Sequence, residues 1–203
     1  VKLMAEVIKV IGKNAFVQVF ESTRGMRVGD EAEFEGHMLE VTLGPGMLSR
    51  NYDGLQNDLD KMEGVFLRRG EYTFPLDNDK LWDFKPLAKV GDKVAAGGWL
   101  GEVDENFQPH KIMVPFTFKG EYTVKSLKEA GQYTIGEVIA VLTDETGKDV
   151  EVTMIQRWPV KRAITCYKEK PRPYKLLETG VRTIDTVNPI VEGGTGFIPG
   201  PFG

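Results

Sequence analysis

Turn-forming residues interrupt this chain too often for long helices to dominate it. The 203 residues include 23 glycines and 11 prolines, and both residue types favour turns and break regular elements. Short apolar segments lie between them. Residues 6–11 and 15–20 partly alternate apolar and polar side chains on either side of the turn Gly12-Lys13-Asn14. Because alternation with a period of two predicts β-strands, we expect a mainly β protein with many short strands.

Composition excludes several classes of protein. Hydrophobic residues make up 41% of the chain and charged residues 28%, which is typical of globular proteins rather than disordered or fibrous ones. The formal net charge of −4 argues against a nucleic-acid-binding surface. A single cysteine, Cys166, excludes an intramolecular disulfide framework. No apolar run approaches the roughly 20 residues of a membrane span, and no signal peptide opens the chain, so we expect an intracellular protein without direct membrane insertion.

The order of turns and strands predicts four segments. Residues 1–56 carry closely spaced strand candidates and predict a small β-barrel. Residues 57–64 form a connection that has room for a short helix. Residues 65–156 predict a second β-domain, and residues 157–203 begin with the strand end Trp158-Pro159 and continue into a glycine-rich tail.

A weak internal duplication runs through the second β-domain. Residues 131–136 resemble residues 90–98, and the strand candidate at 138–142 resembles the one that follows residue 98. Such self-similarity predicts a domain of two related halves. The run Val90 to Gly97 also resembles biotinyl- and lipoyl-carrier domains, which present a modified lysine on a hairpin. The segment that we assign to that hairpin, residues 103–110, has no lysine, so we interpret the likeness as shared architecture without carrier function.

The chain ends on the first residues of a phosphate-binding motif. A P-loop reads G-x-x-x-x-G-K-[ST], in which backbone N–H groups surround phosphate oxygens. Here Gly200, Pro201, Phe202 and Gly203 match its opening, while the second glycine, the lysine and the hydroxyl residue would follow residue 203. Taken alone, this tetrapeptide is a weak indication.

Longer motifs elsewhere in the chain support the interpretation of residues 200–203 as the opening of a P-loop. The run from Glu178 to Thr195, followed by Ile198-Pro199-Gly200-Pro201-Phe202-Gly203, resembles the run that enters the P-loop of rotary ATPases. The form with Ile-Pro-Gly-Pro-Phe-Gly is that of the catalytic A subunits of the vacuolar and archaeal types. The barrel of the same subunits is similar to residues 18–30. The connection that follows the barrel is similar to residues 43–48 and 52–56, and the return from the inserted domain is similar to residues 158–162.

The resemblance implies a fold, a function and a set of partners. The fold would be an N-terminal β-barrel without its first strands, an inserted barrel-sandwich-like β-domain, and the start of a P-loop α/β domain. The intact subunit would bind ATP or ADP with Mg²⁺ and couple ATP hydrolysis or synthesis to proton or sodium transport. It would alternate with B subunits in a hexameric ring, contact a central rotor and peripheral stalk subunits, and lie in the cytoplasm on a membrane-bound complex.

In this chain the resemblance places no catalytic residue, and we expect the 203 residues alone to be inactive. The alternative is a free-standing barrel-sandwich interaction module without catalysis.

Other residues that could suggest a site have simpler interpretations. His37 and His110 stand far apart without neighbouring ligands, so we interpret them as solvated loop histidines rather than metal ligands. Cys166 has no base beside it and predicts an inert thiol. Asp53, Asp58 and Asp60 predict turns and a helix cap, with Asn57 as the other candidate cap. Aromatic residues near lysines, at 82–85 and 116–119, could form a nucleic-acid face, but the acidic charge balance argues against it.

Overall fold

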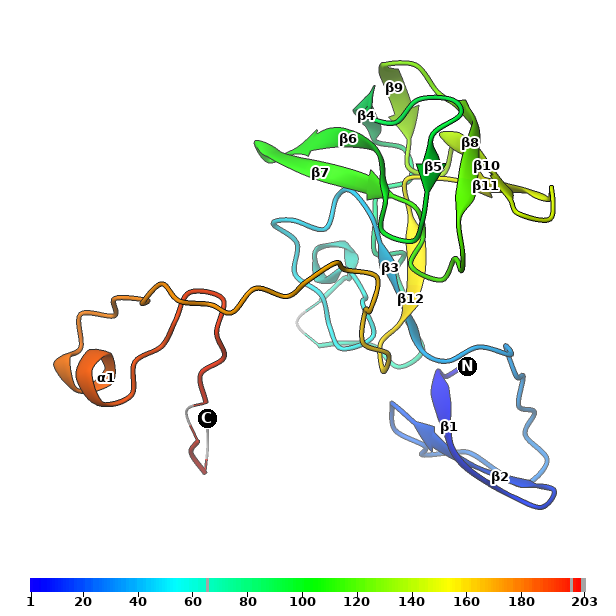
Figure 1. Cartoon of the computed structure of the whole chain (residues 1–203). Coiled ribbons are helices and arrows are strands. Elements are labelled where there is room, and N and C mark those ends of the chain that lie inside the picture. Colours follow the sequence, from blue (N-terminus) through cyan, green and yellow to red (C-terminus); the bar gives the residue numbers. More distant parts are fainter. Residues whose placement is uncertain (65, 198, 202–203) are drawn as a thin grey trace. The chain divides into compact units, whose positions relative to one another are not determined.

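The computed structural model describes residues 1–64, 66–197 and 199–201 (Figure 1). The chain divides into two compact units, Val1–Cys166 and Tyr167–Gly203. Almost all regular structure in the first unit is β, which confirms the predicted fold class. Its strands are β1 (Ala5–Ile11), β2 (Asn14–Val19), β3 (Glu40–Leu43), β4 (Leu81–Pro86), β5 (Lys93–Val94), β6 (Trp99–Glu105), β7 (Gln108–Met113), β8 (Tyr122–Leu127), β9 (Gly131–Thr134), β10 (Ala140–Asp144), β11 (Asp149–Val152) and β12 (Gln156–Pro159).

Eight of these strands build two antiparallel sheets that exchange one strand each. The sheet orders are β7-β6-β4-β9 and β11-β10-β8-β5. If β4–β7 is one half and β8–β11 the other, each half keeps three strands in its own sheet and gives its second strand to the other sheet. Every strand then has a counterpart four places along the chain, so the predicted duplication is confirmed as an architectural symmetry.

Two apolar clusters fill this domain. The alternation along β4 places Trp82 and Phe84 inside and Asp83 and Lys85 outside, as expected for a strand with one buried face. The first cluster contains Leu76, Trp82, Phe84, Val103, Ile112, Ile135, Ile139 and Met154. The second contains Leu100, Val114, Val124, Ala140, Leu142 and Val152, and the partly buried Leu127 packs against both.

A two-stranded sheet joins segments that are far apart in sequence. β12 pairs antiparallel with β3, so that Gln156 lies opposite Leu43 and Pro159 opposite Glu40. The side-chain amide of Gln56 accepts a hydrogen bond from the Thr42 N–H and donates one to the Thr42 C=O, both at 2.7 Å. Gln56 thereby acts as a one-residue partner for β3 and satisfies backbone groups that an edge strand would leave unpaired.

The N-terminal strands form a hairpin, not a closed barrel. β1 and β2 make a separate two-stranded sheet with an irregular register between Val7 and Lys9. Their apolar side chains are largely exposed rather than alternately buried, since the described chain supplies no second layer over them. Residues 32–34, for which the sequence favours a short strand, lie in no regular element. These features agree with an incomplete barrel.

The two helices of the described residues are short. The 3₁₀ helix η1 (Leu59–Lys61) begins after Asp58, whose side chain accepts a hydrogen bond from the Asp60 N–H, so the predicted cap is confirmed. In the second unit, α1 (Arg182–Val187) is the only helix within the part that the structure describes. No helix in the described part of the chain has the length and apolar character to cross a membrane.

Candidate functional site

Two of the four residues that match the P-loop opening lie in the part of the chain that the structure describes. Gly200 and Pro201 are exposed, and Pro201 lies in a turn. The other two predicted binding residues, Phe202 and Gly203, lie outside the described residues. Of the described residues 199–201, only Gly200 has a backbone N–H to donate to a phosphate, since its two neighbours are prolines, and none of the three carries a lysine or hydroxyl side chain. By themselves they do not make a site for ATP and Mg²⁺, and no catalytic step follows from them.

A single carboxylate organises the loop ahead of this segment. Asp185 on α1 accepts hydrogen bonds from the Thr179 hydroxyl at 2.6 Å, the Thr179 N–H at 3.1 Å and the Gly180 N–H at 3.0 Å. The hydrogen bonds from Thr179 and then from Gly180 lower the pKa of Asp185, because they favour its ionised form. The run Glu178 to Asp185 that carries the family resemblance is therefore a closed turn held by its aspartate.

The first unit has a buried carboxylate that sequence reasoning missed. Glu105, at the end of β6, is only 3% exposed. Its Oε1 atom accepts hydrogen bonds from the N–H groups of Gly46 at 2.7 Å and Leu48 at 2.9 Å. Its Oε2 atom lies 2.7 Å from Nδ1 of His110. Because a buried carboxylate needs such partners to offset its desolvation, Glu105 fixes the loop after β3 against the β6–β7 hairpin.

This result corrects the interpretation of His110. We expected a solvated loop histidine, but His110 lies on β7 and bonds to Glu105. His37 does lie in a loop, with its Nε2 atom 3.4 Å from Glu35. The period of two along β6 and β7 carries a usable signal, because Glu105 shares the inward face with Val103, and His110 shares one with Ile112.

Backbone strain gathers at the same place. Among the residues that the structure describes, four non-glycine residues have positive φ angles, and three of them are Ser49 at 61°, Asn106 at 53° and Phe107 at 63°. Asn106 and Phe107 form the two-residue turn between β6 and β7, a turn type in which asparagine followed by glycine is favoured. The Asn106 side chain donates a hydrogen bond to the Ser49 hydroxyl at 3.1 Å. Positive φ costs about 1–3 kcal/mol for a non-glycine residue, and most at a bulky one such as Phe107.

Asp53 and Asp58 serve structure, as predicted, and Asp58 does more, while the Asp60 carboxylate forms no cap and lies 4.0 Å from Arg50 Nη1. Asp53 accepts hydrogen bonds from the Leu55 and Asn57 N–H groups and from the Asn57 side chain. Asp58 caps η1 but is also 1% exposed, with Arg50 Nη1 at 3.7 Å and Lys61 Nζ at 3.6 Å from Oδ2. Arg50, Asp58 and Lys61 therefore form a local ion cluster around the buried Asp58 carboxylate. The sequence spacing of the aspartates alone does not reveal this cluster.

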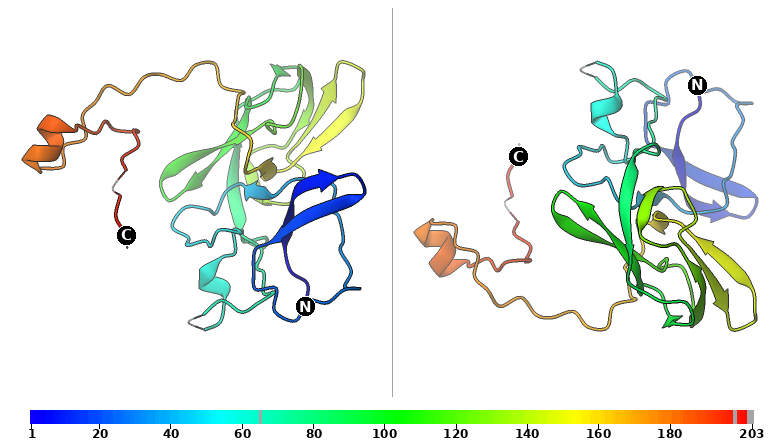
Figure 2. Two further views of the ribbon diagram at one scale, coloured as in Figure 1. Left: turned by 90° about the horizontal axis from the view of Figure 1, so that it is seen from below. Right: turned by 90° about the horizontal axis from the view of Figure 1, so that it is seen from above.

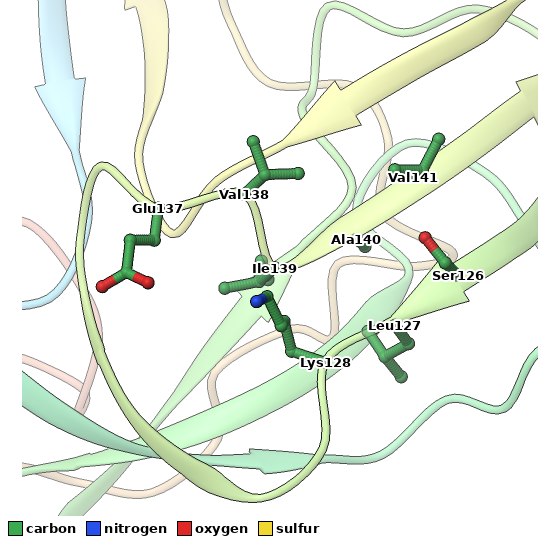
Figure 3. Close-up of a pocket in the computed structure, with 8 residues that line it drawn as sticks. All are labelled: Ser126, Leu127, Lys128, Glu137, Val138, Ile139, Ala140 and Val141. Carbon is green, nitrogen blue, oxygen red and sulfur yellow. The ribbon is translucent and has the colours of Figure 1, made fainter.

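Two cavities lie within the part of the chain that the structure describes. The larger, of about 370 Å³, lies at the register shift between β8 and β10 and is lined by residues 126–128 and 137–141. Figure 3 shows mostly aliphatic side chains around it, together with Ser126, Lys128 and Glu137. A second cavity of about 280 Å³ is lined by Glu21, Ser22 and residues between 53 and 72. Within residues 1–64, 66–197 and 199–201, no group of three or more His, Cys, Asp or Glu side chains could hold a metal ion.

Two other expectations are also resolved. Trp82 and Phe84, which could have belonged to a nucleic-acid face, are buried in the first apolar cluster. The carrier-type hairpin was wrongly placed at residues 103–110: that hairpin lies within the first half, and the connection between the halves is residues 114–121, which carries the exposed Lys119. A lone exposed lysine has no feature that marks it for modification.

Comparison with known proteins defines the class. The β-barrel domain of the ATP synthase alpha/beta family matches residues 2–36, and the barrel-sandwich domain of ATP synthase alpha/beta subunits matches residues 73–161. These matches fall on the open β1–β2 region and on the two strand-exchanged sheets.

Whole-chain relatives carry the assignment further. The chain is 48% identical over 205 aligned residues to a V-type ATP synthase alpha chain of Treponema denticola, covering 100% of this chain and 35% of that protein. It is 48% identical to the V-type ATP synthase alpha chain of Borrelia garinii subsp. bavariensis, over 99% of this chain and 36% of the relative, and 44% identical to that of Protochlamydia amoebophila, over 100% and 34%. The chain belongs to the ATP synthase alpha/beta family and, within it, groups with the V-type alpha chains, of which it spans about a third of the length.

Proposed function

We propose that this chain is the N-terminal portion of the catalytic subunit of a V-type rotary ATPase. The observation that carries the proposal is the match to V-type ATP synthase alpha chains along the whole of this chain. The full subunit would couple ATP hydrolysis or synthesis to proton or sodium transport, as part of a complex bound to the cytoplasmic face of a membrane. The work of these residues would be structural: assembly of the ring and contacts at its outside.

The same proposal gives each segment a role. Residues 1–56 would belong to the N-terminal barrel that joins alternating A and B subunits. Residues 57–64 would connect this barrel to the inserted domain, which residues 65–156 would form. The boundaries are supported by the separate matches at 2–36 and 73–161. Residues 157–203 would lead into the nucleotide-binding domain, with Gly200, Pro201, Phe202 and Gly203 opening its P-loop. ATP or ADP and Mg²⁺ would bind there only with residues that this chain does not include.

The gene and the full-length protein test this proposal. We expect the reading frame to continue after codon 203 into Gly-Lys-Thr or Gly-Lys-Ser, and we expect the full-length subunit assembled with its B subunits to hydrolyse ATP. Alanine in place of the P-loop lysine should abolish that activity while the complex still forms. A native stop codon after residue 203, or a full-length protein that neither assembles with B subunits nor hydrolyses ATP, would favour the free-standing interaction module instead.

A further inference from the structure

Residues 37–72 lie between the two matched domains and belong to neither, since the matches cover residues 2–36 and 73–161. The 3₁₀ helix η1 lies in this stretch, drawn in cyan outside the strands of the two four-stranded sheets (Figure 1 and both views of Figure 2). It begins after Asp58, which is only 1% exposed. Because burying a carboxylate is costly unless neighbouring groups compensate its charge, the groups around Asp58 show what this residue holds together.

Asp58 connects three segments of the chain. Its N–H donates a hydrogen bond to the Thr73 hydroxyl at 2.7 Å, and its Oδ1 atom accepts one from the Asp60 N–H at 3.2 Å. Its Oδ2 atom lies 3.7 Å from Arg50 Nη1 and 3.6 Å from Lys61 Nζ. The residue therefore holds the chain before η1, η1 itself and the chain after it at one point, since a buried charge attracts its counter-ions more strongly than an exposed one does.

Lys61 carries this connection into the barrel-sandwich domain. Its Nζ atom donates hydrogen bonds to the carbonyl oxygens of Phe74 at 3.3 Å and Leu76 at 3.1 Å. The Leu76 side chain is 2% exposed and belongs to the first apolar cluster. Asn57 adds an uncharged contact, because its Oδ1 atom accepts the Thr73 N–H at 2.9 Å. The segment that enters the domain is thereby bonded to η1 through its backbone.

The same segment bonds at its other end to the N-terminal strands. The Tyr72 hydroxyl donates a hydrogen bond to the Glu21 carboxylate and accepts one from the Met4 N–H at 2.8 Å. Glu21 also accepts the Gly70 N–H at 2.7 Å. Met4 lies just before β1 and Glu21 just after β2. Residues 70–76, which we call the strap, therefore have one end on the β1–β2 hairpin, their middle on η1 and their other end in the apolar core.

We propose that Asp58 and Lys61 make the strap a rigid joint that fixes the barrel-sandwich domain relative to the β1–β2 hairpin. Two domains of one chain move relative to each other by default unless the contacts between them prevent it. Outside the strap, Lys161 Nζ lies 2.8 Å from Glu6 Oε2, but an ion pair at the surface contributes little. The charge of Asp58 therefore decides whether the joint is rigid. The inference needs neither a partner nor ATP hydrolysis, so it goes beyond the proposed function and can fail without it.

Hydrogen exchange in the full-length subunit tests the proposal. Asp58→Asn keeps the shape of the side chain and an acceptor for the Asp60 N–H, but it removes the charge that faces the two cations. We expect exchange in residues 51–62 and in the strap to become about ten-fold faster or more, because local opening controls exchange, while β6, β8 and β10 keep their protection. Asp60→Asn is the matched control: the Asp60 side chain is 52% exposed, and its replacement should leave exchange unchanged.

The distance between two spin labels reports on the joint itself. We would replace the native cysteines of the full-length subunit with serine and attach labels at Lys13→Cys, in the β1–β2 turn, and at Lys148→Cys, in the β10–β11 turn. Both lysines are exposed. We expect a narrow distance distribution in the parent and, with Asp58→Asn, one that is about two-fold wider or more, because the domains regain their relative motion.

Each contrary result would overturn the proposal. A broad distribution in the parent would mean that the strap is a hinge. A distribution that Asp58→Asn leaves unchanged, with or without faster exchange, would mean that other contacts fix the domain. Faster exchange throughout β6, β8 and β10 would mean that Asp58 supports the stability of the whole domain. If Asp58→Asn does not fold, Lys61→Met supplies the same two readouts, since it removes one cation and the two hydrogen bonds to the strap.

Discussion

At position 105, one buried side chain serves donors from two separate segments of the chain. Glu105→Ala removes the acceptor for the Gly46 and Leu48 N–H groups and for His110. Since a hydrogen bond to a charged group contributes about 1.5–3 kcal/mol, we expect the loss of these bonds to lower the free energy of unfolding by about 2–4 kcal/mol. Glu105→Gln keeps an acceptor oxygen and should lose less. Urea denaturation measures both, and the exposed Glu151→Ala should stay within about 0.5 kcal/mol of the parent; equal losses at 105 and 151 would contradict the role of Glu105.

The pKa of Asp53 predicts a specific acid sensitivity. Burial raises the pKa, but hydrogen bonds from the Asn57 side chain and from the N–H groups of Asn57 and Leu55 outweigh it and hold it below the usual 3.8. A carboxyl with a lowered folded-state pKa adds stability above its unfolded pKa, and that stability is lost as the pH falls below about 4. Denaturation at successive acidic pH values should therefore show a shallower loss for Asp53→Asn than for the parent. The exposed Asp79→Asn should follow the parent, and a parallel fall in all three proteins would refute the assignment.

At the scale of single residues, sequence reasoning succeeds where the role is local. Asp58 as a helix cap and Asp53 as a turn former follow from short-range backbone hydrogen bonds, and both are observed. The roles of Glu105 and His110 were not predicted, because Glu105 bonds to a loop almost 60 positions away and His110 bonds to Glu105. The only local signal is the alternation along β6 and β7, which places Glu105 and His110 on the same faces as the buried Val103 and Ile112.

Within elements, the close approach of β4 and β6 depends on a glycine. A Cβ atom on Gly101 would overlap the Phe84 ring and lie 2.8 Å from the Lys85 carbonyl oxygen. Both neighbours belong to the buried sheet, so overpacking should lower the stability of Gly101→Ala by about 1–3 kcal/mol. Gly136→Ala is the matched control, because nothing lies within 4 Å of its added Cβ. Thermal unfolding of the two variants measures the difference, and indistinguishable curves would show that the sheet accommodates the methyl group.

Strand positions were predicted more easily than strand partners. Alternation located β1 and β2, and the glycine-punctuated repeats located β6 and β10, since each signal lies within a few residues. The exchange of β5 and β9 between the sheets has no such local signal: it depends on which apolar faces meet in the two clusters. At residues 32–34 the sequence favours a strand that the structure does not contain, because a short apolar segment forms no strand without a neighbour to pair with.

At the scale of the whole molecule, nucleotide binding should require more than this chain. The described tail offers exposed backbone at Gly200 and Pro201, while charge stabilisation of a γ-phosphate needs cationic side chains and a metal. We expect isothermal titration of the 203-residue chain with Mg-ATP to give no heat of binding. The full-length subunit is the positive control, and a dissociation constant in the low micromolar range for the short chain would contradict the prediction.

The strand exchange also predicts how much of the chain folds alone. Every strand of the two four-stranded sheets lies within residues 65–156, as do the buried members of both apolar clusters, so this segment should unfold cooperatively as an isolated domain. Met47, which packs against the first cluster, lies outside it. The segment also lacks β3 and the Gly46 and Leu48 N–H groups that pair with Glu105. A longer piece, residues 40–161, restores both and should melt at a higher temperature, because a buried carboxylate regains its donors.

Calorimetry would compare the melting temperatures of the two pieces, and dispersed amide resonances in an NMR spectrum would show whether each piece is folded. A collapsed spectrum for residues 65–156 with a folded 40–161 would move the domain boundary to the β3–β12 pair. Identical melting temperatures would mean instead that Glu105 stabilises only the loop it holds.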